Sequence, residues 1–100
     1  MPAAAREKRL EWAPRALDAY LATLARIAGQ DPFTAQQFVE RVEHALTVII
    51  SHPSIGTPAL RRGERRYPIA NTGHVVNYRV MRSVVRIQLW YRARQHVVQR

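Results

Sequence analysis

Two stretches of the chain place apolar residues at helical spacing. The first starts at Pro14, a residue suited to the first turn of a helix, and ends near Gly29. Its apolar positions recur every three or four residues: Leu17, Tyr20, Leu21, Leu24 and Ile27. The second starts at Asp31, a typical N-cap residue, and keeps the same spacing as far as Ile50. Since only residues 29–31 separate the two patterns, the sequence predicts an antiparallel helical hairpin.

Shorter stretches of alternating apolar and polar residues predict strands on both sides of this hairpin. Leu10 and Trp12 alternate with charged neighbours, which predicts a short first strand. Beyond a loop at 54–63, strands are expected at 65–70, 74–80 and 84–91, with a hairpin turn at 71–73. The fold class is therefore α+β in the order β-α-α-β-β-β. The N-terminal strand and the helical hairpin are expected to pack on one face of a small antiparallel sheet.

Side-chain alternation in the last strand separates apolar from basic positions. One face carries Val85, Ile87, Leu89 and Tyr91, and the other carries Arg86, Gln88, Trp90 and Arg92. Because the helices must cover an apolar face, Arg79, Arg86 and Arg92 are expected on the face left open. Strict alternation would turn Tyr91 under the helices, unless a bulge at the end of the strand exposes it.

The charge of the chain is concentrated in its second part. With 100 residues, 47% of them hydrophobic, the chain suits one domain over residues 1–100. From residue 61 onward it holds ten arginines and a single acid, Glu64, which together account for the net charge of +9. A basic part joined to a neutral one indicates a face that meets a polyanion or an acidic partner.

The residue types that are missing exclude several classes of protein. Without cysteine there is neither a disulfide framework nor a thiolate metal site. The residues that begin the sequence are too polar for a signal peptide, and the apolar runs are too short to span a membrane. A cytoplasmic protein with no membrane partner is therefore expected.

No common catalytic motif is present, and the four histidines show no metal-ligand spacing, so neither a cofactor nor a metal is expected. The remaining candidate is a cluster of arginines and aromatic residues, namely Arg65, Arg66, Tyr67, Tyr78, Arg79, Arg86, Trp90, Tyr91, Arg92 and Arg94. Such a cluster can hold phosphates and stack on bases. Alternatively, the aromatic residues are ordinary sheet residues and the arginines a solvated face.

Several short segments, in their order along the chain, resemble those of one known family. They are Leu10-Glu11-Trp12, Pro14-Arg15-Ala16-Leu17-Asp18, Phe38-Val39-Glu40-Arg41-Val42, His52-Pro53-Ser54-Ile55-Gly56, Asn77-Tyr78-Arg79-Val80 and Tyr91-Arg92-Ala93-Arg94-Gln95. Together they are similar to the RelE/ParE superfamily of toxins from bacterial type II toxin–antitoxin modules. The resemblance spans nearly the whole chain, and the superfamily fold agrees with the fold predicted above.

The resemblance implies a growth-arresting toxin that a cognate acidic antitoxin neutralises in the bacterial cytoplasm. ParE-like members inhibit DNA gyrase and are not regarded as nucleases, whereas RelE-like members cleave mRNA on the ribosome. The long helical hairpin favours the ParE-like branch. So does the scarcity of lysine, since RelE-like nucleases carry lysines before and within the sheet, and Lys8 is the only lysine here.

Two alternatives stay open beside gyrase inhibition. If the protein is a ribosome-dependent endoribonuclease, the resemblance implies that Arg65, Arg79, Tyr91 and Arg94 carry catalysis, and the ribosome and mRNA are its partners. The other alternative is a basic nucleic-acid-binding module without a toxic role. The basic face expected to bind the target comprises Arg65, Arg66, Arg79, Arg86, Arg92 and Arg94.

Overall fold

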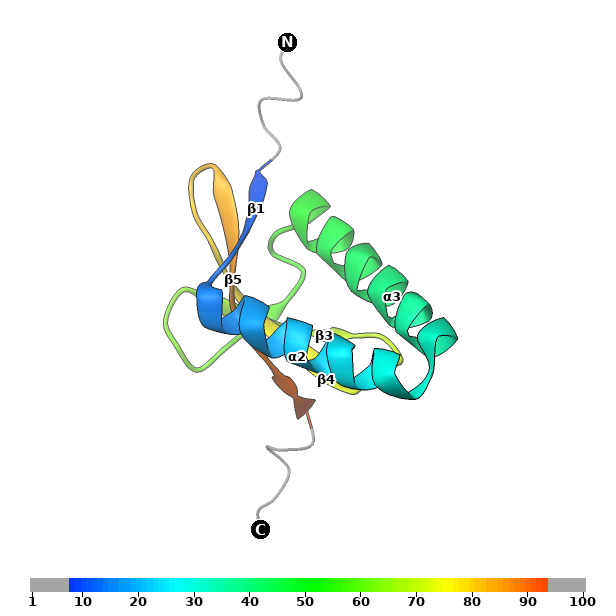
Figure 1. The fold of residues 1–100 in the computed structure, drawn as a ribbon. Coiled ribbons are helices and arrows are strands. Elements are labelled where there is room, and N and C mark those ends of the chain that lie inside the picture. Colours follow the sequence, from blue (N-terminus) through cyan, green and yellow to red (C-terminus); the bar gives the residue numbers. More distant parts are fainter. Residues whose placement is uncertain (1–7, 94–100) are drawn as a thin grey trace.

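The computed structural model describes residues 8–93, and these form two helices and a five-stranded sheet. In chain order the elements are β1 (Arg9–Trp12), α2 (Pro14–Gln30), α3 (Pro32–Ser51), β2 (Thr57–Pro58), β3 (Glu64–Ile69), β4 (His74–Val80) and β5 (Val84–Arg92). Figure 1 shows α2 crossing the strands with α3 beside it. The α+β fold predicted from the sequence, with its order of elements, is confirmed.

The sheet is mixed. Its strand order is β1-β5-β4-β3-β2, and β1 runs parallel to β5 while the other neighbours are antiparallel. The antiparallel arrangement expected from the sequence thus holds for β2 to β5. Alternation within β1 could not indicate its direction relative to β5, which lies far away in the sequence. The two-residue strand β2 lies within the segment predicted as a loop and pairs with β3.

The connection between the helices is shorter than predicted. Helix α2 continues through Gly29 to Gln30, so the prediction that Gly29 ends it is wrong. Asp31 alone separates the helices, because it is both the C-cap residue of α2 and the N-cap residue of α3. Its backbone N–H donates to the carbonyl of Ile27 at 2.9 Å, and its carboxylate accepts from the N–H of Phe33 at 3.1 Å.

The two helices bury their apolar faces to different extents. On α3 the predicted face is confirmed, with Phe38, Val42 and Ile49 fully buried against the sheet. On α2, Ala16 and Thr23 are buried instead, while Leu17 and Leu21 are exposed by 37% and 48%. The apolar stripe of α2 is therefore wider than the surface that the core covers.

Strand β5 contains a bulge at Gln88. Asn77 of β4 pairs with Leu89 and the next residue, Tyr78, pairs with Ile87, so Gln88 has no partner across the ladder. The extra residue reverses the alternation beyond it. Trp90 consequently packs into the core under the helices, and the prediction that it shares a face with Arg86 is wrong.

Neither helix within residues 8–93 combines the length and the apolar character needed to cross a bilayer.

Candidate binding face of the sheet

The helices leave one face of the sheet uncovered, and we call it the open face. Strand register and contacts assign to it the side chains of Glu11, Glu64, Arg66, Asn77, Arg79, Arg86, Leu89 and Tyr91. These residues come from four strands that are far apart in the sequence. Of the cluster predicted from the sequence, four members share this face: Arg66, Arg79, Arg86 and Tyr91.

A row of four charged side chains crosses the open face, with two arginines at its centre and an acid at each end. The register sets Glu11 opposite Arg86, Arg86 opposite Arg79, and Arg79 opposite Glu64. Arg86 Nη1 lies 3.0 Å from Glu11 Oε1, and Arg79 Nη2 lies 3.6 Å from Glu64 Oε2. Each arginine thus has an acid on its outer side, which offsets the repulsion between the two guanidinium groups. Within this row the formal charges cancel.

Glu64 is the buried end of this row. Only 1% of its side chain is exposed, and neither carboxylate oxygen accepts a hydrogen bond from the residues described. Arg61 Nη1 lies 3.9 Å from Oε2. Gly63, at φ +82°, leaves room for Arg79, because a Cβ there would lie 2.7 Å from Arg79 Nη1. Glu64 was not among the predicted site residues, although its being the only acid in the sequence after residue 61 was a signal.

Arg65 does not belong to the open face, contrary to the prediction. Its Nη1 donates to the carbonyl of Gly56 at 2.7 Å. Beside it, the Tyr78 hydroxyl donates to the carbonyl of Pro53 at 2.7 Å and accepts from the N–H of Gly56 at 2.9 Å. Burial raises the pKa of Tyr78, while the Gly56 hydrogen bond and the Arg65 charge lower it. Arg65 and Tyr78 therefore fix the loop that follows α3.

Arg92 also lies on the face of the sheet that the helices cover, because the bulge at Gln88 reverses the alternation of β5 beyond it. It pairs across the ladder with His74, whose ring stacks on Trp90 with centroids 4.9 Å apart. The pKa of His74 is lowered, first by burial and then by the charges of Arg92 and Arg26, against a hydrogen bond to the Thr72 carbonyl that raises it. Arg92 is thus an exposed neighbour of a buried histidine and not a member of the open face.

The bulge that buries Trp90 brings Tyr91 to the open face, as the sequence analysis allowed. The Tyr91 hydroxyl donates to Asn77 Oδ1 at 2.8 Å. Among the residues that the nuclease alternative would use, Arg79 and Tyr91 share this face, and Arg65 lies on the other. Arg94 falls outside the described residues, so its predicted place in both residue sets stays a prediction.

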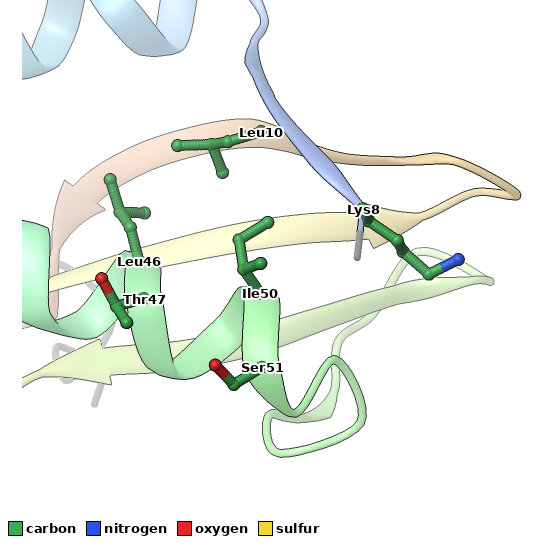
Figure 2. Close-up of a pocket in the computed structure, with 6 residues that line it drawn as sticks. All are labelled: Lys8, Leu10, Leu46, Thr47, Ile50 and Ser51. Carbon is green, nitrogen blue, oxygen red and sulfur yellow. The ribbon is translucent and has the colours of Figure 1, made fainter. Parts of the chain in front are cut away.

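Two hollows adjoin these surfaces. One, of about 650 Å³, lies on the open face between the sheet and residues 58–61. The other, of about 270 Å³, lies beside β1, between Leu10 and the end of α3, where Figure 2 shows Leu46 and Ile50 on the helix turned toward the sheet. No group of three or more potential metal ligands occurs among residues 8–93.

Comparison with known proteins places this fold and its helix-covered sheet among toxins of toxin–antitoxin systems. The chain matches the family model described as ParE toxin of type II toxin-antitoxin system, parDE, over residues 10–96. It is 30% identical over 77 residues to Y4kP of Sinorhizobium fredii (strain NBRC 101917 / NGR234), a candidate toxin by name. That match covers 77% of this chain and 80% of Y4kP.

The fold is also similar to a solved structure titled chromosomal ParDE TA system from P. aeruginosa. The TM-score is 0.74 at 17% identity, covering 87% of this chain and 97% of the other. The chain belongs to the ParE toxin family of type II toxin–antitoxin systems. The resemblance to the RelE/ParE superfamily, on its ParE-like side, is confirmed.

Proposed function

We propose that this ParE-type toxin arrests bacterial growth in the cytoplasm by inhibiting DNA gyrase and that a cognate acidic antitoxin neutralises it. The family membership carries the proposal. The open face supports the target-binding part of the proposal with a surface able to meet acidic groups of gyrase, since Arg66 makes no ion pair or side-chain hydrogen bond within residues 8–93. Arg79 and Arg86 have carboxylate partners that a partner's own acids could replace.

Two features support an antitoxin that folds onto the toxin. Leu17 and Leu21 form an uncovered apolar strip on α2. The outer edge of β1 has no neighbouring strand among the described residues, and the 270 Å³ hollow lies next to it (Figure 2). An edge strand beside an apolar groove suits a segment that adds a strand or lays down an amphipathic helix. The antitoxin would thereby occupy surfaces other than the open face.

Three contacts argue against the nuclease alternative. Arg65 donates a hydrogen bond to the Gly56 carbonyl, Arg79 is paired with Glu64, and the Tyr91 hydroxyl donates a hydrogen bond to Asn77 Oδ1. A general base for RNA cleavage would have to accept a proton from a ribose hydroxyl, and within residues 8–93 no carboxylate or histidine is exposed beside Arg79 and Tyr91. The proposed activity is therefore inhibition by binding and not catalysis.

The direct test is a supercoiling assay with purified gyrase and the whole chain. We expect the wild type to inhibit supercoiling and Arg66→Ala to weaken inhibition by about tenfold, since an interface arginine is worth one to a few kcal/mol. The matched control is Arg15→Ala, an exposed arginine on α2. Full supercoiling in the presence of wild-type protein that arrests growth would refute the gyrase target. Cuts in ribosome-bound mRNA in a cell-free translation reaction would instead establish the nuclease.

Antitoxin binding can be separated from target binding on the same chain. Leu21→Glu should weaken neutralisation by the antitoxin while inhibition of gyrase stays at the wild-type level. Gln36→Glu, which adds the same charge at an exposed position of α3, serves as the control. Neutralisation of the Leu21→Glu variant at wild-type antitoxin concentrations would exclude the α2 strip as the docking surface.

A further inference from the structure

The open-face cavity has the size of a small-molecule site. At about 650 Å³ it falls within the range of cavities that enclose a ligand of a few hundred daltons. One wall is the segment from Pro58 to Arg61, and the floor is formed by side chains of β3, β4 and β5.

One end of the cavity is basic. Arg66 makes no side-chain hydrogen bond or ion pair with the described residues, and Arg61 has only its 3.9 Å contact with Glu64. The Arg61 side chain is 65% exposed, so it can turn without disturbing the core. Two arginines with available N–H groups suit a phosphate, because each can donate two parallel hydrogen bonds to its oxygens.

The other end of the cavity is largely apolar. Leu89 and Tyr91 line it from β5, and Asn77 lies between them and the basic end. Asn77 Oδ1 already accepts from Tyr91, which orients the amide so that its NH₂ group is left to donate. An aromatic ring lying against Leu89 and Tyr91 could accept that hydrogen bond on a ring nitrogen or a carbonyl oxygen.

Besides its basic and apolar ends, the cavity contains a buried carboxylate, that of Glu64. Glu64 lines the cavity, its side chain is 99% buried, and neither carboxylate oxygen accepts a hydrogen bond from residues 8–93, although Arg79 Nη2 lies 3.6 Å from Oε2. A buried carboxylate without a hydrogen-bond donor is costly, so a ligand that supplies one gains affinity. Because Arg61, Arg66 and Arg79 surround this end, a neutral donor such as a sugar hydroxyl suits it better than a cation.

We propose that this cavity binds a ribonucleoside monophosphate. The phosphate lies between Arg61 and Arg66, the base lies against Leu89 and Tyr91, and a ribose hydroxyl donates to Glu64 once Arg61 has turned toward the phosphate. The same chemistry exists in a free nucleotide and in an RNA strand. A cavity of about 650 Å³ is large enough for a single nucleotide, and the proposal is therefore made for the free form. The assignment stands on the cavity alone and is independent of the gyrase proposal.

The test is a titration of the ¹⁵N-labelled whole chain with AMP, GMP, CMP and UMP, followed by NMR. We expect at least one of them to shift the Asn77 side-chain amide and the Leu89 backbone amide in a saturable way. Arg66→Ala should raise the dissociation constant about tenfold, as expected for the loss of a charge-assisted contact. Arg15→Ala, on a helix away from the cavity, should leave it unchanged.

Further arms of the titration distinguish the sources of the signal. The 2′-deoxy form of the preferred nucleotide should bind more weakly, because it removes a donor for Glu64. Equal binding of inorganic phosphate, absence of saturable shifts with all four nucleotides at millimolar concentration, or an unchanged dissociation constant in Arg66→Ala would each overturn the site. A single-stranded RNA trimer that binds more than about tenfold more tightly would overturn the assignment to a free nucleotide.

Discussion

The two faces of the sheet hold their polar groups in different ways. On the covered face each buried polar side chain has specific short hydrogen bonds: Tyr78 to Pro53 and Gly56, and Trp90 Nε1 to the Thr23 hydroxyl at 3.0 Å. On the open face, charges face one another in a row at distances from 3.0 to 3.6 Å, and the Glu64 carboxylate accepts no hydrogen bond from the part of the chain that the structure describes. The buried polar groups named on the covered face are hydrogen-bonded, whereas the buried carboxylate of the open face is held by ion pairs alone.

This difference separates residues that hold the fold together from residues available to a partner. Arg65 and Arg66 are neighbours in the sequence, yet Arg65 anchors the loop after α3 and Arg66 lines the open-face cavity. Substitutions on the covered face should therefore change stability first. Substitutions on the open face should change binding while leaving stability nearly intact.

The largest effect is expected where the covered face meets α3. Phe38 is 4% exposed and packs against Tyr20, His74 and Trp90. Phe38→Ala should lower the free energy of unfolding by about 3–5 kcal/mol, measured by thermal or urea denaturation. Phe33, 67% exposed on the same helix, is the control, and Phe33→Ala should cost no more than about 0.5 kcal/mol. Similar losses in the two variants would refute the contrast between buried and exposed helix faces.

A smaller loss should follow removal of one hydroxyl from the covered face. Tyr78→Phe leaves the buried N–H of Gly56 and the Pro53 carbonyl without their partner, so we expect a loss of about 1–3 kcal/mol in urea denaturation. Tyr67→Phe is the matched control, because the half-exposed Tyr67 makes no side-chain hydrogen bond within residues 8–93. A Tyr78→Phe variant as stable as wild type would show that the loop after α3 does not depend on this hydroxyl.

Protonation of His74 should weaken the covered face. Its pKa is lowered in the folded protein by burial, Arg92 and Arg26, whereas in the unfolded chain it is about 6.5. Between the pKa of His74 in the folded protein and its higher pKa in the unfolded chain, the unfolded chain binds more protons. The free energy of unfolding therefore falls as the pH drops through about 6.5, by at most about 1.4 kcal/mol per pH unit. Denaturation at several pH values should show this slope in wild type and in His44→Gln, where the exposed His44 is replaced. This dependence of stability on pH should be absent in His74→Gln. A slope in His74→Gln equal to that of wild type would show that another group causes it.

The smallest effect is expected on the open face. Glu11 and Arg86 are 46% and 35% exposed at their side chains, so their 3.0 Å pair is solvent-screened. Glu11→Gln should cost less than about 1 kcal/mol in thermal denaturation, and less still at high salt. If gyrase binds this face, the same variant should inhibit supercoiling at least as well as wild type, since Arg86 is released. A loss above 2 kcal/mol, on the order of a buried pair, would remove the contrast between the faces.

Much of the fold was predictable because it depends on local spacing. The start of α3 at Asp31-Pro32, the buried stripe around Phe38 and the range of β4 follow from residues near one another in the sequence. The site was predicted less completely. Arg66, Arg79 and Arg86 lie on the open face as expected, whereas Arg65 and Arg92 do not.

The part of the site that the sequence did not predict depends on contacts between segments far apart in the sequence. The bulge at Gln88 accompanies the packing of Trp90 against Thr23 and Phe38, which lie on the helices, and nothing in the sequence around Gln88 signals it. The single bulge decides the faces of Leu89, Trp90, Tyr91 and Arg92 together, because every side chain beyond it changes sides.

The sequence by itself determined the order of helices and strands, the concentration of charge after residue 60 and the absence of thiol chemistry, since each is a property of composition or local period. The tertiary structure alone decided which face each side chain of β5 takes, that Glu11 and Glu64 pair with arginines, and that a cavity forms above Asn77. The physical reason is register. The alignment of residues across neighbouring strands determines which charged side chains form ion pairs and where a cavity is left.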